Sequence, residues 1–336
     1  MSAGGSSDDG DAAVLTYILR RVLYSVPVLI IASFLVFWGI RTTYDPTAKY
    51  RTSKDAARVI AEKRKELGLD RPILAQWWTW FTGFLHGNLG TSERTGDKVS
   101  HMLTHALWPS LQLMFWGLII ALVLAIAVGV YSAVKQYSAG DYAFTGISYV
   151  GIAMPTFLFG LLSISLLVTL PVTKFHLNQP IFYSVGLHSE GQSGFNLDYL
   201  RHLALPVAAL TVQSVAVWSR FQRASMLDIL NADYVRTARA KGVPQRKVIF
   251  KHAFRNALIP LVTVVALDTA FLVGGLVITE QIFSIAGMGR LFLDSLQFGD
   301  APVLLGWFLI VALFVITFNL FADLAYGWLD PRIRVS

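Results

Sequence analysis

Six stretches of the chain are apolar over about the length that an α-helix needs to cross a lipid bilayer: 22–40, 106–134, a segment within 142–173, 203–219, 256–279 and 301–322. A bilayer core about 30 Å thick takes about 20 apolar residues in helical form. Charged residues make up only 15% of the chain, against roughly 25% in soluble domains. Because backbone polar groups cannot stay unpaired in hydrocarbon, the sequence predicts an all-α integral membrane protein with six transmembrane helices.

The distribution of positive charge predicts the orientation. With the N-terminus inside, the inside and outside segments each carry 14 Lys and Arg residues. Long loops contribute little to the positive-inside rule. Without the long first outside loop the tally is 14 inside against 3 outside. We therefore expect both termini to be cytoplasmic.

The segments around the spans suggest a domain plan. We expect a disordered acidic tail over 1–16, a first transmembrane helix over 17–41, a sizeable extracytoplasmic region over 42–105, a core of five helices over 106–329 and a cytoplasmic tail over 330–336. The extracytoplasmic region contains a charged, helical run at 53–67 and the tryptophans Trp77, Trp78 and Trp80. These tryptophans are either an aromatic belt at the membrane interface or part of a cap that meets a partner.

The most informative segment is the basic loop 226–258, which carries seven Lys and Arg residues against two Asp. Asp233 can cap a short helix over 234–241. Gly242 can end that helix in a left-handed conformation, and Pro244 can open a second helix. A loop that only attracts anionic lipid needs no such order. We therefore predict a helix, a break and a second helix, forming a cytoplasmic docking surface.

The second helix of the loop is predicted to have two stripes. Lysine and arginine recur every fourth residue on one of them, and apolar residues occupy the stripe beside it. The basic stripe consists of Lys247, Lys251 and Arg255, and the apolar stripe of Ile249, Ala253, Phe250, Phe254 and Ala257.

Two acidic residues lie in the predicted fifth span or at its end. Asp268 costs at least about 3 kcal/mol at mid-membrane, which makes it a candidate functional residue. It either lines the translocation path and attracts a cationic group, or is a buried acid that is paired or protonated. Glu280, at the outer end, is either a gate or an interface residue. Pro155 is expected to kink the third span.

The basic loop contains two informative motifs, Tyr234-Val-Arg-Thr-Ala-Arg-Ala-Lys-Gly242 and His252-Ala-Phe-Arg-Asn-Ala-Leu-Ile-Pro260. Together they resemble the cytoplasmic loop of ABC-transporter permeases of the dipeptide and oligopeptide type. Importers in general have a Glu where this chain has Arg236, and a shorter distance from Gly242 to Pro260. Both departures are usual in the peptide branch.

Further motifs extend the resemblance over nearly the whole chain, to the first (B-type) permease of the pair. They include Leu67-Gly-Leu-Asp-Arg-Pro-Ile73, Met154-Pro155 and Asp330-Pro-Arg-Ile-Arg334. The run Ser284-Ile-Ala-Gly-Met-Gly289 departs from the family by having Ala286 where a proline is usual.

The resemblance implies the type I ABC importer permease fold, in the plasma (inner) membrane of a prokaryote. It implies a second homologous permease, two ABC ATPase subunits or domains, an extracytoplasmic substrate-binding protein, a peptide substrate and surrounding membrane lipid. ATP and Mg would be bound by the partner ATPases, so we expect no cofactor in this chain. The residues expected to couple to an ATPase are Tyr234, Arg236, Thr237, Ala238, Arg239, Ala240, Lys241 and Gly242.

Other classes of function have less support in the sequence. The motif G-x-x-x-x-G-K-[ST] is absent, as are H-E-x-x-H, G-x-S-x-G and G-x-G-x-x-G, so we expect no catalytic residue and no ATP site. We also expect no metal site and no nucleic-acid partner. His101 and His105 are more consistent with a surface pair than with metal ligands. The alternatives are an importer for nickel or glutathione, an ion-coupled secondary transporter, or a membrane anchor or receptor without transport.

Overall fold

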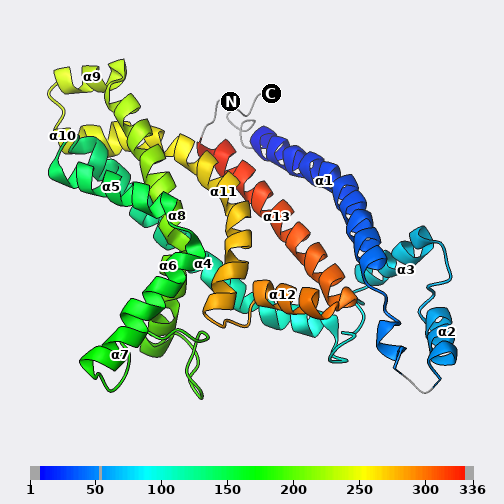
Figure 1. Ribbon diagram of the computed structural model, residues 1–336. Helices are drawn as coiled ribbons and strands as arrows, with labels where there is room; N and C mark the ends of the chain where they lie inside the picture. Colours follow the sequence, from blue (N-terminus) through cyan, green and yellow to red (C-terminus); the bar gives the residue numbers. More distant parts are fainter. Residues whose placement is uncertain (1–7, 53–54, 330–336) are drawn as a thin grey trace. The chain divides into compact units, whose positions relative to one another are not determined.

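The chain folds almost entirely into helices (Figure 1). A computed structural model describes residues 8–52 and 55–329. The α-helices are α1 (Asp8–Thr43), α2 (Ala56–Glu66), α3 (Ile73–Leu85), α4 (Val99–Val134), α5 (Ala139–Ala153), α6 (Thr156–Ile164), α7 (Leu170–Phe175), α8 (Leu197–Leu230), α9 (Asp233–Ala240), α10 (Gln245–Lys247), α11 (Phe254–Ile282), α12 (Met288–Phe298) and α13 (Ala301–Leu329). Shorter helical turns cover Ala48–Tyr50, Ser165–Thr169 and Val248–Ala253. Within the described ranges there is no strand, so the all-α prediction is confirmed.

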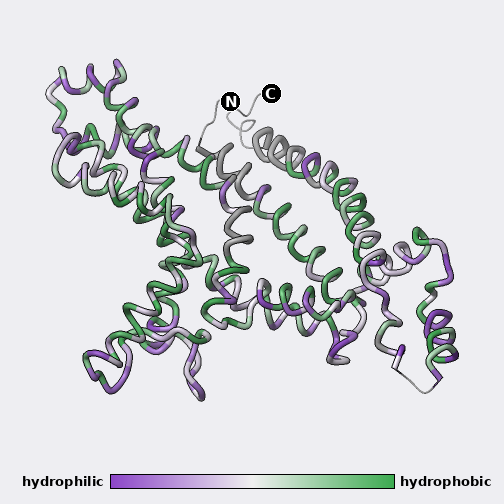
Figure 2. The backbone as a smooth tube through the Cα atoms, in the orientation of Figure 1, coloured by the Kyte–Doolittle hydropathy of each residue, from purple (hydrophilic) through white to green (hydrophobic). Residues whose placement is uncertain are grey.

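Six helical stretches are long and apolar enough to cross a membrane, as predicted. They are Ile18–Thr43, Val99–Val134, Thr156–Phe175, Leu197–Leu230, Gln245–Ala266 and Ala301–Leu320. Figure 2 shows hydrophobic residues along the long helices and hydrophilic ones gathered on α2 and α9. Several of these helices extend past the predicted spans because polar residues at the ends continue the helical turn.

Two local predictions need correction. Met154 is extended and Pro155 precedes α6, so the third span is broken into α5 and α6 rather than kinked; a residue before proline disfavours the helical region. The expected disorder of 1–16 does not hold from Asp8 onward, because α1 continues back through this alanine-containing stretch. Residues 1–7 and the tail 330–336 lie outside the described part of the chain.

The chain forms two compact units. The N-terminal unit comprises residues 1–107 and 291–320, and the central unit residues 108–290 and 321–336. We expected a single core over 106–329. Instead, the first turns of α13 belong with the N-terminal unit because their apolar side chains pack on α1 and α3. The residues of that core are Phe37, Ile40, Trp77, Phe81, Ala301, Leu304 and Leu305.

The tryptophans of α3 differ in burial: Trp77 is buried and Trp78 is exposed. Trp77 is buried, stacks on Phe81 and donates its indole N–H to Ser33 Oγ of α1 at 3.2 Å. Trp78 is 57% exposed. The α3 helix is therefore packed on α1 by one face, while the other face remains available to lipid or to a partner.

Asp300 fastens the segment before α4 to the start of α13 within the N-terminal unit. Its buried carboxylate accepts hydrogen bonds from Ser92 Oγ at 2.5 Å and from the Glu93 N–H at 3.0 Å. The Tyr44 hydroxyl donates to the Leu296 carbonyl at 2.9 Å. The Asp300 contacts link the start of α13 to the segment before α4, and the Tyr44 contact links the residue after α1 to α12.

The central unit is built around α8, which packs against α5, α6 and α11. Its contact with α4 is close because Gly129 has no side chain. A Cβ atom on Gly129 would lie 2.6 Å from Gln222 Cβ and 2.7 Å from the Ser219 carbonyl oxygen. Small residues allow such close approach between membrane helices, where apolar burial alone does not drive association.

Candidate functional site

The predicted basic loop is largely helical, and its break lies at the predicted place. Helix α8 runs to Leu230, α9 covers Asp233–Ala240, and Gly242 has a φ of 74°, the left-handed conformation that favours glycine. Asp233 lies in the first turn of α9, and the residue before the helix is Ala232. The predicted Asp233 cap is therefore wrong, because the helix begins one residue earlier than expected. Pro244 precedes α10, as predicted.

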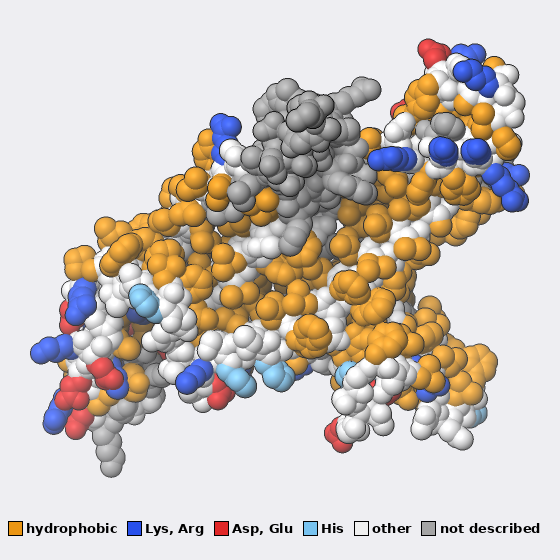
Figure 3. All heavy atoms as spheres, turned by 180° about the vertical axis from the view of Figure 1, so that it is seen from behind, with side chains coloured by type: hydrophobic (Ala, Val, Ile, Leu, Met, Phe, Trp, Pro, Cys, Tyr) orange, Lys and Arg blue, Asp and Glu red, His pale blue; other side chains and the backbone are white. Residues whose placement is uncertain are grey.

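Helix α9 presents a polar, basic surface and is anchored through a few side chains. Val235 is fully buried, and Asn256 Nδ2 of α11 donates to the Tyr234 hydroxyl at 2.9 Å. The exposed residues from the predicted coupling set are Tyr234, Arg236, Thr237, Arg239, Ala240, Lys241 and Gly242. Figure 3 shows Lys and Arg side chains gathered over this part of the chain. The Tyr234–Asn256 hydrogen bond thus links α9 to α11.

The stripes predicted for the second helix are partly present. Ile249, Ala253 and Ala257 are buried in an apolar cluster with Met226 and Leu230 of α8. The basic residues Lys247, Lys251 and Arg255 are exposed. Phe250, predicted for the apolar stripe, is 63% exposed. Phe250 lies outside the apolar stripe because the turn over Val248–Ala253 is π-helical, which changes the direction in which successive side chains point.

An ion pair between α5 and α8 lies within the same unit. Arg223 Nε and Nη2 donate to the two Asp141 oxygens at 3.0 and 2.9 Å. The Asp141 side chain is buried. The hydrogen bond from Arg223 lowers the pKa of the Asp141 carboxyl, against the opposing effect of burial, and the Tyr137 N–H lowers it further. The sequence analysis did not predict this bidentate contact.

Asp268 lies in α11 and is paired with one tryptophan of α8. The fully buried Trp218 donates its indole N–H to Asp268 Oδ2 at 2.7 Å. Asp268 itself is only half-buried. The second carboxylate oxygen is therefore available to a further cationic or hydrogen-bonding group, which is compatible with both alternatives stated for this residue.

Glu280 is fully buried at the end of α11. Ser110 Oγ of α4 donates to Glu280 Oε1 at 2.5 Å, and the Arg290 N–H donates to Oε2 at 3.0 Å. Ser110 Oγ also accepts from the Met288 N–H at 2.8 Å. Glu280 thus joins α4, α11 and the start of α12, which supports the interface alternative over a gate.

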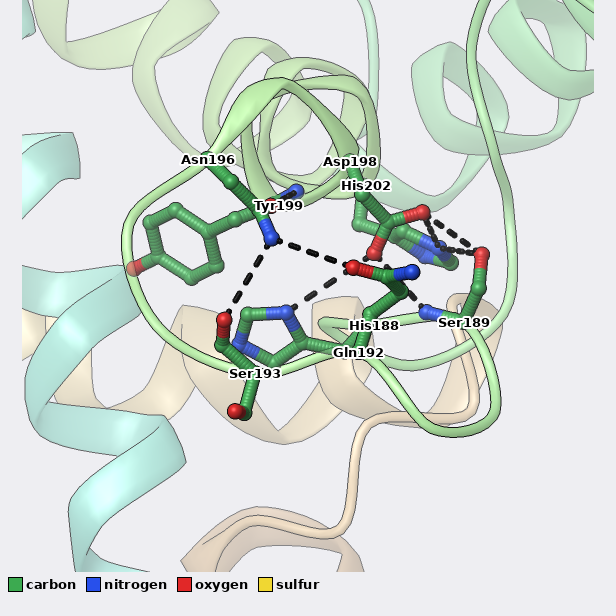
Figure 4. Close-up of polar contacts among 8 residues, drawn as sticks. All are labelled: His188, Ser189, Gln192, Ser193, Asn196, Asp198, Tyr199 and His202. Carbon is green, nitrogen blue, oxygen red and sulfur yellow. Dashed lines mark hydrogen bonds and ion pairs between the residues drawn. The ribbon is translucent and has the colours of Figure 1, made fainter.

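The segment between α7 and α8 is a loop, and hydrogen bonds to Asp198 hold it against the start of α8 (Figure 4). Ser189 donates to Asp198 from its N–H at 2.9 Å and from its hydroxyl at 2.6 Å. His188 and His202 lie 3.8 and 3.6 Å from the same carboxylate. No group of three His, Cys, Asp or Glu side chains in the described residues is arranged to hold a metal ion.

Comparison with known proteins places the chain in a family. Residues 125–335 match the model of the binding-protein-dependent transport system inner membrane component, and residues 14–100 match the model of the N-terminal part of such components. The oligopeptide transport system permease protein AppB of Bacillus subtilis is 37% identical, over 95% of this chain and 99% of that protein. The glutathione transport system permease protein GsiC of Salmonella choleraesuis is 34% identical, over 96% and 99% of the two chains.

The fold agrees with these sequence matches. A solved structure of the MetNI methionine ABC transporter in an inward-facing conformation aligns with a TM-score of 0.52 at 17% identity, over 68% of this chain and 96% of that chain. The six apolar helices and the match over most of the chain lead to the same conclusion: this protein belongs to the family of inner membrane components of binding-protein-dependent transport systems, and it is a multi-pass ABC-transporter permease.

Proposed function

We propose that this chain is the permease subunit of an ATP-driven peptide importer, that it forms half of a translocation pathway with a second homologous permease, and that it has both termini in the cytoplasm. The oligopeptide permease, at 37% identity, supports a peptide substrate. Glutathione is the second candidate substrate, because the glutathione permease is 34% identical over nearly the same length. Selection among these substrates would be shared with an extracytoplasmic binding protein.

The single observation that carries the coupling part of this proposal is the construction of α9. Seven residues of α9 and the turn after it, between Tyr234 and Gly242, are exposed. The buried Val235 and the hydrogen bond between Tyr234 and Asn256 hold α9 against neighbouring helices. A rigid element of this kind transmits a displacement as a body. We propose that the exposed face, Tyr234 to Gly242, docks on one of two partner ATPases, which supply ATP binding and hydrolysis.

Replacing Gly242 tests this coupling role. Proline fixes φ near −65°, whereas Gly242 has a φ of 74°, so Gly242→Pro changes the path of the chain after α9. We expect ATPase association and transport to fall together, roughly ten-fold or more, corresponding to about 1.4 kcal/mol or more of docking energy. Co-purification of the ATPase and uptake into proteoliposomes would be measured on the same preparations.

Gly242→Asn is the matched control, because asparagine tolerates the left-handed conformation. We expect it to retain most of the association and transport. Ala240→Glu leaves the backbone unchanged and alters only the exposed face, so it should behave like Gly242→Pro. Normal transport and association in both Gly242→Pro and Ala240→Glu would show that α9 is not the coupling element.

Asp268→Asn tests whether Asp268 lines the translocation path. The asparagine oxygen can still accept the Trp218 N–H, so the contact with α8 survives while the negative charge is removed. If Asp268 attracts the amino terminus of a peptide, uptake of peptides with a free amino terminus should fall roughly ten-fold, the equivalent of about 1.4 kcal/mol. Trp218→Phe is the comparison variant, because it keeps the Asp268 charge and removes the indole N–H that donates to it. Unchanged uptake of every substrate by Asp268→Asn would remove the path-lining role.

A further inference from the structure

The N-terminal unit contains a cavity of about 290 Å³ with an amphipathic lining. The cavity lies among the last turn of α1, the 67–72 turn, α3, the 88–93 segment and the first turn of α13. Apolar side chains such as Phe37, Ile40 and Leu305 form part of the wall, and Arg41, Arg71, Gln76 and Trp80 supply polar groups. Protein sites for small molecules usually measure about 300–1,000 Å³, so this cavity suits a compact group rather than a large molecule.

Three polar atoms of the cavity lining are buried without a hydrogen-bond partner among the described residues: Arg41 Nε, Trp80 Nε1 and Gln76 Oε1. The first two are donors and the third is an acceptor. Burying such atoms unpaired costs about 1–3 kcal/mol each, and more for a charged group. Their occurrence in the lining of one cavity suits a ligand that carries both acceptor and donor groups.

The geometry of Gln76 and Trp80 is set by other contacts. Gln76 Nε2 donates to the carbonyls of Leu69 and Arg71 at 3.2 and 2.8 Å, which fixes its amide and leaves Oε1 as the free acceptor. The ring of Trp80 lies 5.6 Å from the ring of Phe37, measured between centroids. The polar groups are thus held in place by the fold and are not mobile surface side chains.

The charges of the lining favour an anion. Arg41 and Arg71 contribute two guanidinium groups, and Glu93 contributes one carboxylate, which interacts electrostatically with Arg41. Guanidinium and indole N–H groups are donors that match the oxygens of a phosphate. Gln76 Oε1 requires a donor, which a phosphate diester lacks, so the ligand must also carry a hydroxyl or an ammonium group.

The surroundings of the cavity favour a lipid over a water-soluble anion. Arg41 lies in the last turn of the spanning helix α1, and Pro302 lies at the start of the spanning helix α13, so the cavity lies at the level where both helices leave the membrane. Apolar side chains near this end of the unit, including Leu35 and Trp38 of α1 and Trp78 of α3, are more than half exposed. Such surfaces pack against acyl chains, and tryptophan is enriched at headgroup level.

We propose that this cavity binds the headgroup of a membrane phospholipid, with the phosphate on Arg41 and Trp80 and a hydroxyl or ammonium group of the same headgroup on Gln76. By the proposed orientation this is a lipid of the outer leaflet. The bound lipid holds α1 and α3 against the first turn of α13, and so stabilises the N-terminal unit.

Native mass spectrometry of the purified full-length chain tests the proposal, with phosphatidylglycerol as the probe. Wild type should retain one phosphatidylglycerol more tightly than phosphatidylcholine, whose choline group cannot donate to Gln76. Arg41→Gln should weaken retention roughly ten-fold, and Trp80→Phe, which keeps the ring and removes only the N–H, roughly five-fold. The conservative Trp80→Phe change keeps the test valid if Arg41→Gln does not fold.

Arg58→Gln is the matched control. Arg58 is an exposed arginine of α2 in the same unit, paired with Glu62 at 3.1 Å, and it does not line the cavity. Its lipid retention should equal that of wild type. Retention that is equal in wild type, Trp80→Phe and Arg41→Gln would overturn the site. Displacement of the lipid by inorganic phosphate at the same concentration would overturn the lipid assignment and leave a plain anion site.

Discussion

Arg223→Met is expected to lower the free energy of unfolding of the chain by about 3–5 kcal/mol, because it leaves the buried Asp141 carboxylate without its charge partner. The pair is bidentate, with both N–O distances at or below 3.0 Å. The methionine side chain can fill much of the space of the arginine stem, so lost packing contributes little. Chemical unfolding of the purified chain in mixed micelles measures the effect.

A double-mutant cycle separates the ion pair from other effects. Arg223→Met leaves the Asp141 charge buried without its partner, and Asp141→Asn removes that charge. The double variant should therefore be more stable than Arg223→Met alone. Arg220→Met is the control from the same helix: its guanidinium lies 4.9 Å from the Tyr149 ring centroid, a contact of about 0.5–1 kcal/mol. A loss for Arg223→Met no larger than that for Arg220→Met would contradict the assignment.

The same pair should give a defined pH dependence. Its folded-state pKa is below that of an unfolded aspartate, so the unfolded chain binds the proton more readily. The stabilisation is therefore complete above about pH 4 and is lost as the pH falls through the folded-state pKa. The difference in unfolding free energy between wild type and Asp141→Asn should be constant near neutral pH and should shrink under acid conditions.

The features that the sequence predicted well are those set by local pattern. Long apolar runs determine the six helices, because a helix crosses a bilayer when it is both long enough and apolar. The break at Gly242 was also predictable, since glycine is favoured at a left-handed position whatever surrounds it. The start of α9 was missed by one residue, because Ala232 rather than Asp233 precedes the helix and the sequence pattern does not fix a helix end to a single residue.

The features that could not be predicted depend on contacts between distant residues. Arg223 and Asp141 are 82 positions apart, and Glu280 and Ser110 are 170 apart. The cavity beside Arg41 combines α1 and α3 with α13 from the other end of the chain. Nothing in hydrophobic periodicity specifies which helices meet. For the same reason, the assignment of α13 to the N-terminal unit became apparent only from its packing on Phe37 and Trp77.

Gly289→Ala is expected to destabilise the central unit by roughly 3 kcal/mol or more, at the upper end of the effects of overpacking. A Cβ atom on Gly289 would overlap Val277 Cα, would lie 2.9 Å from Val277 N, and would approach Glu280 Oε2 to 3.1 Å. Two of these neighbours are backbone atoms of α11, which cannot move like a flexible side chain. The new methyl group must therefore displace the start of α12, and with it the Arg290 N–H that satisfies Glu280.

The effect of Gly289→Ala should come from this contact and not from the loss of a glycine as such. Gly146 of α5 is a helical glycine with no atom within 4 Å of a built Cβ, so Gly146→Ala should be neutral or stabilising by up to about 1 kcal/mol. Ser110→Ala removes a donor to Glu280 without adding bulk, and should destabilise by about 1–3 kcal/mol. If Gly289→Ala and Ser110→Ala both unfold like Gly146→Ala, the buried Glu280 carboxylate does not hold α4, α11 and α12 together. If Gly289→Ala and Ser110→Ala lose stability and Gly146→Ala does not, glycine is required at position 289. It lets backbone N–H groups at the start of α12 approach the Glu280 carboxylate.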